Sequence, residues 1–88
     1  MDGKNNIFTM YYRVIETLYD NQVTINDNTF TPMTQSDIAV AVGCDRMTVN
    51  SIIKKLKSDN MLNTEHIRKN QYKFSDEAIR IVKAIKKI

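Results

Sequence analysis

The fold is decided by residues 34–59, which read TQSDIAVAVGCDRMTVNSIIKKLKSD. Thr34 and Asp37 have the spacing of a capping box, in which two residues three apart satisfy each other's backbone N–H groups at the start of a helix. Gly43 supplies the left-handed residue that ends such a helix. Asp45 follows two residues later and can cap another helix. The stretch therefore predicts two helices joined by a tight turn.

The apolar residues of this stretch follow helical spacing. Met33 and Ile38 bracket the first cap with the spacing of a hydrophobic staple, and Asn60 is a plausible stop for the second helix. The apolar positions of the first helix are Ile38, Ala39, Ala41 and Val42. Those of the second helix fall at i, i+3, i+4 and i+7, and they are Val49, Ile52, Ile53 and Leu56. We expect each helix to bury one narrow stripe against the other.

The residues before this stretch predict another helix and a β segment. We expect residues 1–6 to be frayed and a helix to run from Ile7 to about Asp20. Its broad apolar face comprises Ile7, Phe8, Tyr11, Tyr12, Val14, Ile15, Leu18 and Tyr19. Residues 22–33 contain two β-favouring runs around the turn-forming cluster 26–28. They predict either a hairpin or a single strand in the second run, closed by Pro32.

The residues after the stretch predict a second β segment and a last helix. Residues 61–74 alternate loosely around a polar run and are typical of a β-hairpin with a basic tip. Ser75 can cap a helix whose first turn is acidic and whose last turn is basic, as the helix dipole favours. The expected apolar face of that helix comprises Ala78, Ile79, Ile81, Val82, Ile85 and Ile88.

The segment from Gln35 to Leu56 resembles a helix-turn-helix motif. The residues that carry the resemblance are Ala39, Gly43, Val49 and Ile52. With the hairpin and the helix that opens at Ser75, the whole resembles a winged helix-turn-helix domain of the MarR-like kind, over about residues 33–80. The run 72–76 is similar to the strand-to-helix junction after the wing in that superfamily. The wing is short, and the chain is smaller than most full regulators of this type.

The resemblance implies a mainly α fold with a small β-hairpin, an α+β class. We expect one domain over residues 1–88, with a three-helix core, a helix-turn-helix at about 34–59, a wing at about 62–74 and a C-terminal helix. In such domains the second helix of the motif enters the major groove of DNA. The wing reaches the minor groove or neighbouring phosphates in related folds.

Helical geometry identifies the face of the second helix that is free for DNA. With the apolar stripe inward, the outward centre is Met47, Ser51, Lys54 and Ser58. Asn50 and Lys57 flank this centre on one side, and Thr48 and Lys55 on the other. Arg46 suits guanine, Asn50 suits adenine, and Met47 or the Thr48 methyl suits thymine methyl groups. The three lysines, Lys54, Lys55 and Lys57, suit phosphates better than bases.

Two further groups complete the predicted DNA-binding set. Gln35 and Ser36 begin the first helix of the motif, where free N–H groups suit a phosphate. The wing contributes Arg68, Lys69, Asn70, Gln71 and Lys73. Whether the recognition helix or the wing leads sequence preference is left open by the sequence.

The charge is divided unevenly along the chain. The net charge is +3, but residues 1–45 carry two basic and six acidic side chains, whereas residues 46–88 carry eleven basic and four acidic ones. A basic half suggests a polyanion, with nucleic acid first. The competing interpretation is an ordinary solvated lysine surface.

Several function classes are disfavoured by composition. Cys44 and His66 are each the only residue of their type, so neither an internal disulfide nor a Cys/His zinc site is available. We expect Cys44 to point inward and be inert, and His66 to be a sheet residue. No catalytic constellation, cofactor motif, secretory signal or membrane-spanning run is visible. We therefore expect a non-enzymatic, cytoplasmic protein without cofactor.

The favoured interpretation is a sequence-specific double-stranded DNA-binding protein, a small transcriptional regulator. The first alternative is a plasmid or phage accessory factor in replication, conjugative transfer or segregation. The second is a winged-helix module that binds protein and no DNA. The wide apolar faces of the first and last helices predict a homodimer through both, unless they only wrap the small core.

Overall fold

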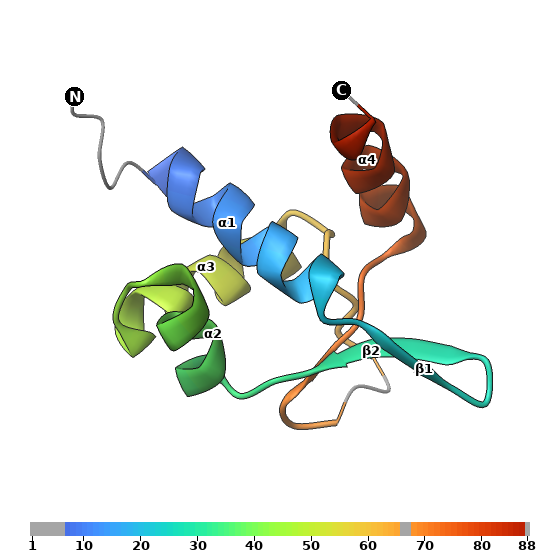
Figure 1. The fold of residues 1–88 in the computed structure, drawn as a ribbon, viewed down its shortest axis with the longest axis horizontal. Helices are drawn as coiled ribbons and strands as arrows, with labels where there is room; N and C mark the ends of the chain where they lie inside the picture. Colours follow the sequence, from blue (N-terminus) through green and yellow to red (C-terminus); the bar gives the residue numbers. More distant parts are fainter. Residues whose placement is uncertain (1–6, 66–67, 88) are drawn as a thin grey trace.

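The computed structural model describes residues 7–65 and 68–87, and Figure 1 shows their arrangement. The described chain forms four helices and a three-stranded antiparallel sheet with the strand order β1-β2-β3. In the view of Figure 1, α1 lies between the α2–α3 pair on one side and α4 on the other. The expected frayed segment 1–6 lies outside the described residues.

The first helix, α1, spans Ile7–Asp20, as predicted. Its buried face is formed by Met10, Val14, Ile15 and Leu18. Met10 was not predicted as an apolar position. Tyr11 and Tyr19 were predicted, but they are only partly buried and pack against the edge of the core. The tyrosine rings therefore rim a core that the aliphatic side chains fill.

The segment after α1 is a β-hairpin, which confirms the first of the two alternatives. Strand β1, Val23–Ile25, pairs with β2, Asn28–Pro32, and Ile25 stands opposite Asn28. Asn26 and Asp27 form the two-residue turn, with φ values of 50° and 67°. Two successive positive φ values define a type I′ turn, whose twist matches that of the strands and which Asn and Asp tolerate.

Helix α2 spans Gln35–Val42 and begins and ends as predicted. The Thr34 hydroxyl accepts from the Asp37 N–H at 3.0 Å, and the Asp37 carboxylate accepts from the Thr34 N–H at 3.1 Å. Gly43 follows with φ 75°, and the Cys44 N–H donates back to the Ala39 carbonyl. A left-handed residue with this back-bond satisfies the last carbonyls of the helix.

Helix α3 spans Arg46–Ser58, and its cap, Asp45, accepts from the Thr48 N–H at 2.7 Å. This bond to the backbone holds the pKa of the Asp45 carboxyl below its usual value. At the other end Asn60 has φ 62°, and the Met61 N–H donates to the Leu56 carbonyl. This is a Schellman motif, and it confirms Asn60 as the stop.

The predicted hairpin over 62–74 is only partly formed. Among the described residues, its two sides meet at the bridge of Leu62 opposite Phe74, which is flanked by bonds from the Asn63 N–H to the Lys73 carbonyl at 2.8 Å and from the Ser75 N–H to the Met61 carbonyl at 2.9 Å. Strand β3, Gln71–Tyr72, forms its ladder instead with Thr31 and Pro32 of β2. The wing (residues 62–74) is thus anchored to the first hairpin rather than paired along its own length.

Helix α4 spans Asp76–Lys86 and is capped by Ser75, whose hydroxyl accepts from the Ala78 N–H at 3.1 Å. Ala78 and Val82 are buried, but Ile81 and Ile85, which belong to the predicted apolar face, are 47% and 41% exposed. Ile88 lies outside the described residues. The apolar face of α4 is wider than the core that it covers.

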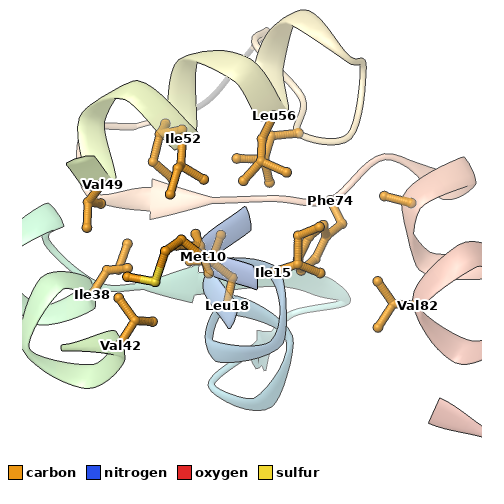
Figure 2. Close-up of a cluster of buried hydrophobic side chains, with 14 of the residues drawn as sticks. Met10, Ile15, Leu18, Ile38, Val42, Val49, Ile52, Leu56, Phe74 and Val82 are labelled. Carbon is orange, nitrogen blue, oxygen red and sulfur yellow. The ribbon is translucent and has the colours of Figure 1, made fainter. Parts of the chain in front are cut away.

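The core lies where α1, α2 and α3 meet, and it extends through Phe74 to α4 (Figure 2). All four predicted stripe residues of α3 are buried, as are Ile38, Ala39 and Val42 of α2, whereas Ala41, the remaining predicted position of α2, is exposed. Leu62, which was not predicted as a core residue, is also buried. Inside, the hydroxyl of the buried Thr31 donates to the Leu18 carbonyl, so this polar group is satisfied. This packing fixes the orientation of α3 and leaves the outward centre of that helix exposed.

Candidate nucleic-acid interface

A hollow of about 570 Å³ lies between the start of α2, one side of α3 and the wing. It brings together segments that are far apart in the sequence, because the start of α2 and the turn of the wing are more than thirty residues apart. The described residues that line it are Thr34, Gln35, Ser36, Arg46, Lys57, Asn63, Thr64, Arg68, Lys69, Asn70, Gln71 and Tyr72. Eight of these twelve belong to the predicted DNA-binding set.

The hollow is a site of positive charge. Four basic side chains line it, and no acidic side chain is among its described lining residues. The basic residues come from both ends of α3 and from residues 68–71 of the wing, here called the wing turn. They are Arg46, Lys57, Arg68 and Lys69. A concave surface of one sign focuses its field on an oppositely charged ligand. This arrangement suits an extended anion that passes between α3 and the wing.

The first turn of α2 forms one wall of this hollow. Thr34 accepts from the N–H of Asp37, so the capping box leaves the N–H groups of Gln35 and Ser36 without a partner inside the helix. Such groups at the positive end of a helix suit a phosphate oxygen. The Gln35 side chain also reaches α3, where its Nε2 donates to Asn50 Oδ1 at 3.3 Å.

The side of α3 that carries Arg46, Asn50 and Lys57, here called the wing-facing flank, borders this hollow. Arg46 and Lys57 line it directly, and Asn50 contacts Gln35, which also lines it. The outward centre of α3 is solvent-exposed as predicted, with Met47 81% exposed. The other exposed members of that centre are Ser51, Lys54 and Ser58.

The opposite side of α3, here called the α1-facing flank, carries Thr48 and Lys55 and faces different surroundings. Lys55 Nζ lies 3.3 Å from Asp59 Oδ2 and 5.9 Å from the centroid of the Tyr11 ring. The Tyr11 hydroxyl donates to the same carboxylate at 2.8 Å. Lys55 was predicted to contact phosphate, and in the structure it lies beside an acidic partner next to α1.

The contact between Tyr11 and Asp59 perturbs the pKa values of both groups. Burial raises the pKa of Tyr11 to about 12, and the hydrogen bond and charge of Asp59 act in the same direction. The Tyr11 hydroxyl is the largest cause that lowers the pKa of Asp59, and Lys55 adds to it. The carboxylate therefore stays charged and continues to neutralise Lys55.

The wing presents three of its five predicted residues to solvent. Arg68, Lys69 and Asn70 are exposed, the Gln71 N–H donates to the Arg68 carbonyl at 3.1 Å, and Asn70 has φ 61°. Lys73 is separate from this group, because its Nζ contacts Asn28 Oδ1 of the first hairpin at 2.6 Å. Of the five predicted wing residues, four line the hollow, and Lys73 is not among its described lining residues.

Sequence reasoning missed four residues that line the hollow. Thr34 was recognised only as a helix cap, and Tyr72 only as a strand residue. Asn63 and Thr64 lie in the part of the wing that precedes its turn in the sequence. No local pattern marks these two, because their position depends on how the wing is anchored to β2.

The remaining titratable candidates lie apart from the hollow. Cys44 is half-buried and packs against the core, as expected, and burial is the main cause that raises the pKa of its thiol. The prediction for His66 falls outside the described residues. Among residues 7–65 and 68–87, no three His, Cys, Asp or Glu side chains are grouped to hold a metal ion. No helix in that part of the chain has the length and apolarity needed to cross a bilayer.

A protein-family model that describes the Crp-like helix-turn-helix domain matches residues 12–77. The chain belongs to the Crp-like helix-turn-helix family. The match begins in α1 and ends at the start of α4, so it includes both hairpin segments and the whole hollow. The winged helix-turn-helix fold predicted from the sequence is confirmed, whereas its MarR-like kind is not, because the matching family is Crp-like.

Solved structures with the same fold include sensors and regulators. The reduced, Fe(II) CO-sensing protein from R. rubrum is 17% identical with a TM-score of 0.74, and the match covers 89% of this chain and 36% of that one. A CRP/FNR-family transcriptional regulator from Thermus thermophilus is 18% identical with a TM-score of 0.62, and the match covers 93% of this chain and 40% of that one. Reduced CprK without ligand is 19% identical with a TM-score of 0.54, and the match covers 92% of this chain and 39% of that one.

At these identities the likeness concerns the fold alone. The chain spans between 36% and 40% of the length of these solved proteins. No curated protein sequence matches the chain.

Proposed function

We propose that this Crp-like domain binds double-stranded DNA and acts in transcriptional regulation, not in catalysis. The observation that carries the proposal is the hollow, where the α2 start, the wing-facing flank of α3 and the wing turn meet with four basic and no acidic described lining residues. Family membership agrees with it, because helix-turn-helix domains place the helix that corresponds to α3 in the major groove.

The proposed binding mode assigns different contacts to different surfaces. The outward centre of α3, with Met47, Ser51 and Lys54, faces the major groove. The hollow receives the sugar–phosphate backbone beside that groove, where Lys57 and the wing turn neutralise phosphates. Arg46 lies at the boundary between the two surfaces, and it is the residue proposed to pair with guanine.

A titration of mixed-sequence duplex DNA at two salt concentrations, followed by fluorescence anisotropy, tests this proposal. Affinity should fall steeply as salt rises, with a slope of log affinity against log salt of about −0.9 for each phosphate contacted. Absence of binding at low salt, or binding that salt leaves unchanged, contradicts the proposal. A protein partner captured with no DNA binding would instead favour the interaction-module alternative.

We further propose that the protein is a homodimer, at least on DNA, and that α4 is the main contact. Ile81 and Ile85 lie one helical turn apart with the small, exposed Ala84 between them, so two helices could approach closely. Acidic residues begin α4 and basic residues lie near its end, so two antiparallel copies would place opposite charges together. Among the described side chains of α1, by contrast, no large aliphatic residue is exposed.

Sedimentation at micromolar concentration, with and without DNA, tests the dimer. The double variant Ile81→Ser, Ile85→Ser should sediment as a monomer, whereas Val40→Ser should not, although Val40 on α2 is 84% exposed. A two-fold dimer would read an inverted repeat with half-sites about one helical turn apart. A wild-type monomer in both conditions, or a site made of direct repeats, contradicts this proposal.

A further inference from the structure

Gln35 and Asn50 form a side-chain contact that links the two helices of the helix-turn-helix motif. Gln35 Nε2 donates to Asn50 Oδ1 at 3.3 Å, and both residues are partly buried. Gln35 is the first residue of α2, and Asn50 lies in the second turn of α3. The contact therefore determines how an amide on the wing-facing flank is oriented.

The geometry around this contact is fixed by the packing beneath it. The capping box holds the start of α2, and the buried Ile38 and Ala39 seat that helix on the core. Val49 and Ile53, on either side of Asn50 along α3, are also buried. Because neither helix can shift without disturbing the core, the separation of the backbone at residues 35 and 50 is set by the motif itself, and it brings the two amides within hydrogen-bonding reach.

An asparagine amide has one acceptor oxygen and one donor NH₂ group, and they point in divergent directions. When Oδ1 of Asn50 is turned toward Gln35 on α2, its Nδ2 is turned away from Gln35. Asn50 then offers donors, and no free acceptor in the same direction, to a group that approaches α3 from outside.

We infer that Gln35 is a positioning residue that makes Asn50 select guanine over adenine in the major groove. The inference rests on the proposed DNA-binding function. Guanine shows two acceptors there, N7 and O6, whereas adenine shows an acceptor beside the N6 donor. Bidentate reading of adenine needs both the oxygen and the NH₂ of the amide, and Gln35 holds that oxygen. This replaces the pairing of Asn50 with adenine that the sequence alone suggested.

Selection of sites from a randomised duplex library tests the inference. The wild-type protein should enrich guanine at one position whose preference disappears in Asn50→Ala. In Gln35→Ala the amide is released, and the ratio of guanine to adenine at that position should fall about tenfold, the order of one base contact. Adding Gln35→Ala to Asn50→Ala should change nothing further at that position.

The substitution Gln35→Glu supplies a test of opposite sign. A carboxylate only accepts, so it would bond Asn50 Nδ2 and turn Oδ1 outward. The position should then favour bases with a major-groove donor, adenine N6 or cytosine N4. Ser36→Ala is the matched control, because Ser36 lines the same hollow on the next residue of α2. It should change affinity for all sequences alike and leave the preference intact.

The possible outcomes distinguish a failure of the proposed DNA-binding function from a failure of this inference. Binding of the wild-type protein to no duplex overturns the proposed function, and this inference with it. If DNA binding is intact, any of three results overturns the inference alone. These are a wild-type preference in both Gln35→Ala and Gln35→Glu, no altered position in Asn50→Ala, or a preference of the wild-type protein for adenine at the position that Asn50 contacts. Thermal unfolding of each variant shows that it is folded during the selection.

Discussion

The two flanks of α3 both carry positive charge, yet their surroundings differ. On the wing-facing flank, Arg46 and Lys57 border a hollow with no acidic side chain among its described lining residues. On the α1-facing flank, Lys55 is paired with Asp59, and Tyr11 donates to the same carboxylate. A basic residue on a recognition helix therefore does not by itself mark a nucleic-acid contact. Its neighbours decide whether its charge is available.

The largest expected effect separates one residue from each flank. Arg46→Ala should weaken binding to a selected site by about 1–3 kcal/mol and relax the preference at one base pair, because it removes a proposed base contact. Lys55→Ala is the control from the other flank, and it should keep both affinity and preference close to wild type. Anisotropy titrations on the selected site measure both. Equal losses in the two variants would erase the distinction between the flanks.

A smaller effect is expected when the acidic partner of Lys55 is removed. In Asp59→Asn the lysine loses its ion pair, so its charge becomes available on the face of α3 that we propose approaches DNA. The salt slope should become steeper by up to about 0.9, the value for one phosphate contact, with no change in base preference. Titrations at several salt concentrations give the slope. If the slope is unchanged, Lys55 lies out of reach of DNA whatever its partner.

The smallest effect concerns stability, and it depends on pH. The pKa of Tyr11 is raised from its ordinary value of 10 to about 12 in the folded protein. A raised pKa contributes stability that is full below pH 10 and is lost as the pH rises toward 12. Tyr11→Phe should therefore lower the free energy of unfolding at neutral pH, and the difference from wild type should shrink above pH 10.

In acid the same comparison depends on Asp59, whose pKa shift is opposite in direction to that of Tyr11. The pKa of Asp59 is lowered in the folded protein, so its contribution is present above its unfolded pKa and is lost as the pH falls through the folded value. The difference between wild type and Tyr11→Phe should therefore also shrink in acid. Urea unfolding across the pH range measures it. A constant difference at every pH would show that the Tyr11–Asp59 bond does not couple α1 to α3.

Features decided within a few residues could be predicted from the sequence. The capping box at Thr34, the left-handed turn at Gly43 and the stop at Asn60 all depend on neighbours along the chain, and all are confirmed. The buried stripe of α3 follows from helical period alone. These features define the helix-turn-helix, and the exposed face of α3 follows from them.

Features that depend on distant residues could not be predicted in the same way. The pairing of β3 with β2 joins strands that are about forty residues apart, so the hairpin pattern of the wing gave no sign of it. Lys73 was predicted to bind DNA as a basic residue of the wing, and its contact with Asn28 could not be foreseen because Asn28 is remote in sequence. The hollow depends on the same pairing, because the pairing holds the wing beside α3.

The position of α4 shows the same limit. Lys86 Nζ lies 3.4 Å from Asp20 and 3.8 Å from Glu16, both on α1. Desolvation alone lowers the pKa of Lys86, but the charges of Asp20 and Glu16 outweigh it and raise the pKa overall. These ion pairs join the end of α4 to α1 while Ile81 and Ile85 remain exposed. Helical period predicted the width of the apolar face but not which part of it the core would cover.

The central claim is that the hollow, rather than the basic charge as a whole, holds the DNA backbone. Two charge-matched triple variants test it most directly in salt titrations with duplex DNA. One replaces Lys57, Arg68 and Lys69 of the hollow with glutamine, and the other replaces Lys55, Lys73 and Arg80 outside it. The first should lose about 2.7 from the magnitude of the salt slope, as expected for three phosphate contacts, while the second keeps the wild-type slope. Equal losses in both variants would show that net charge binds the DNA and would contradict the account.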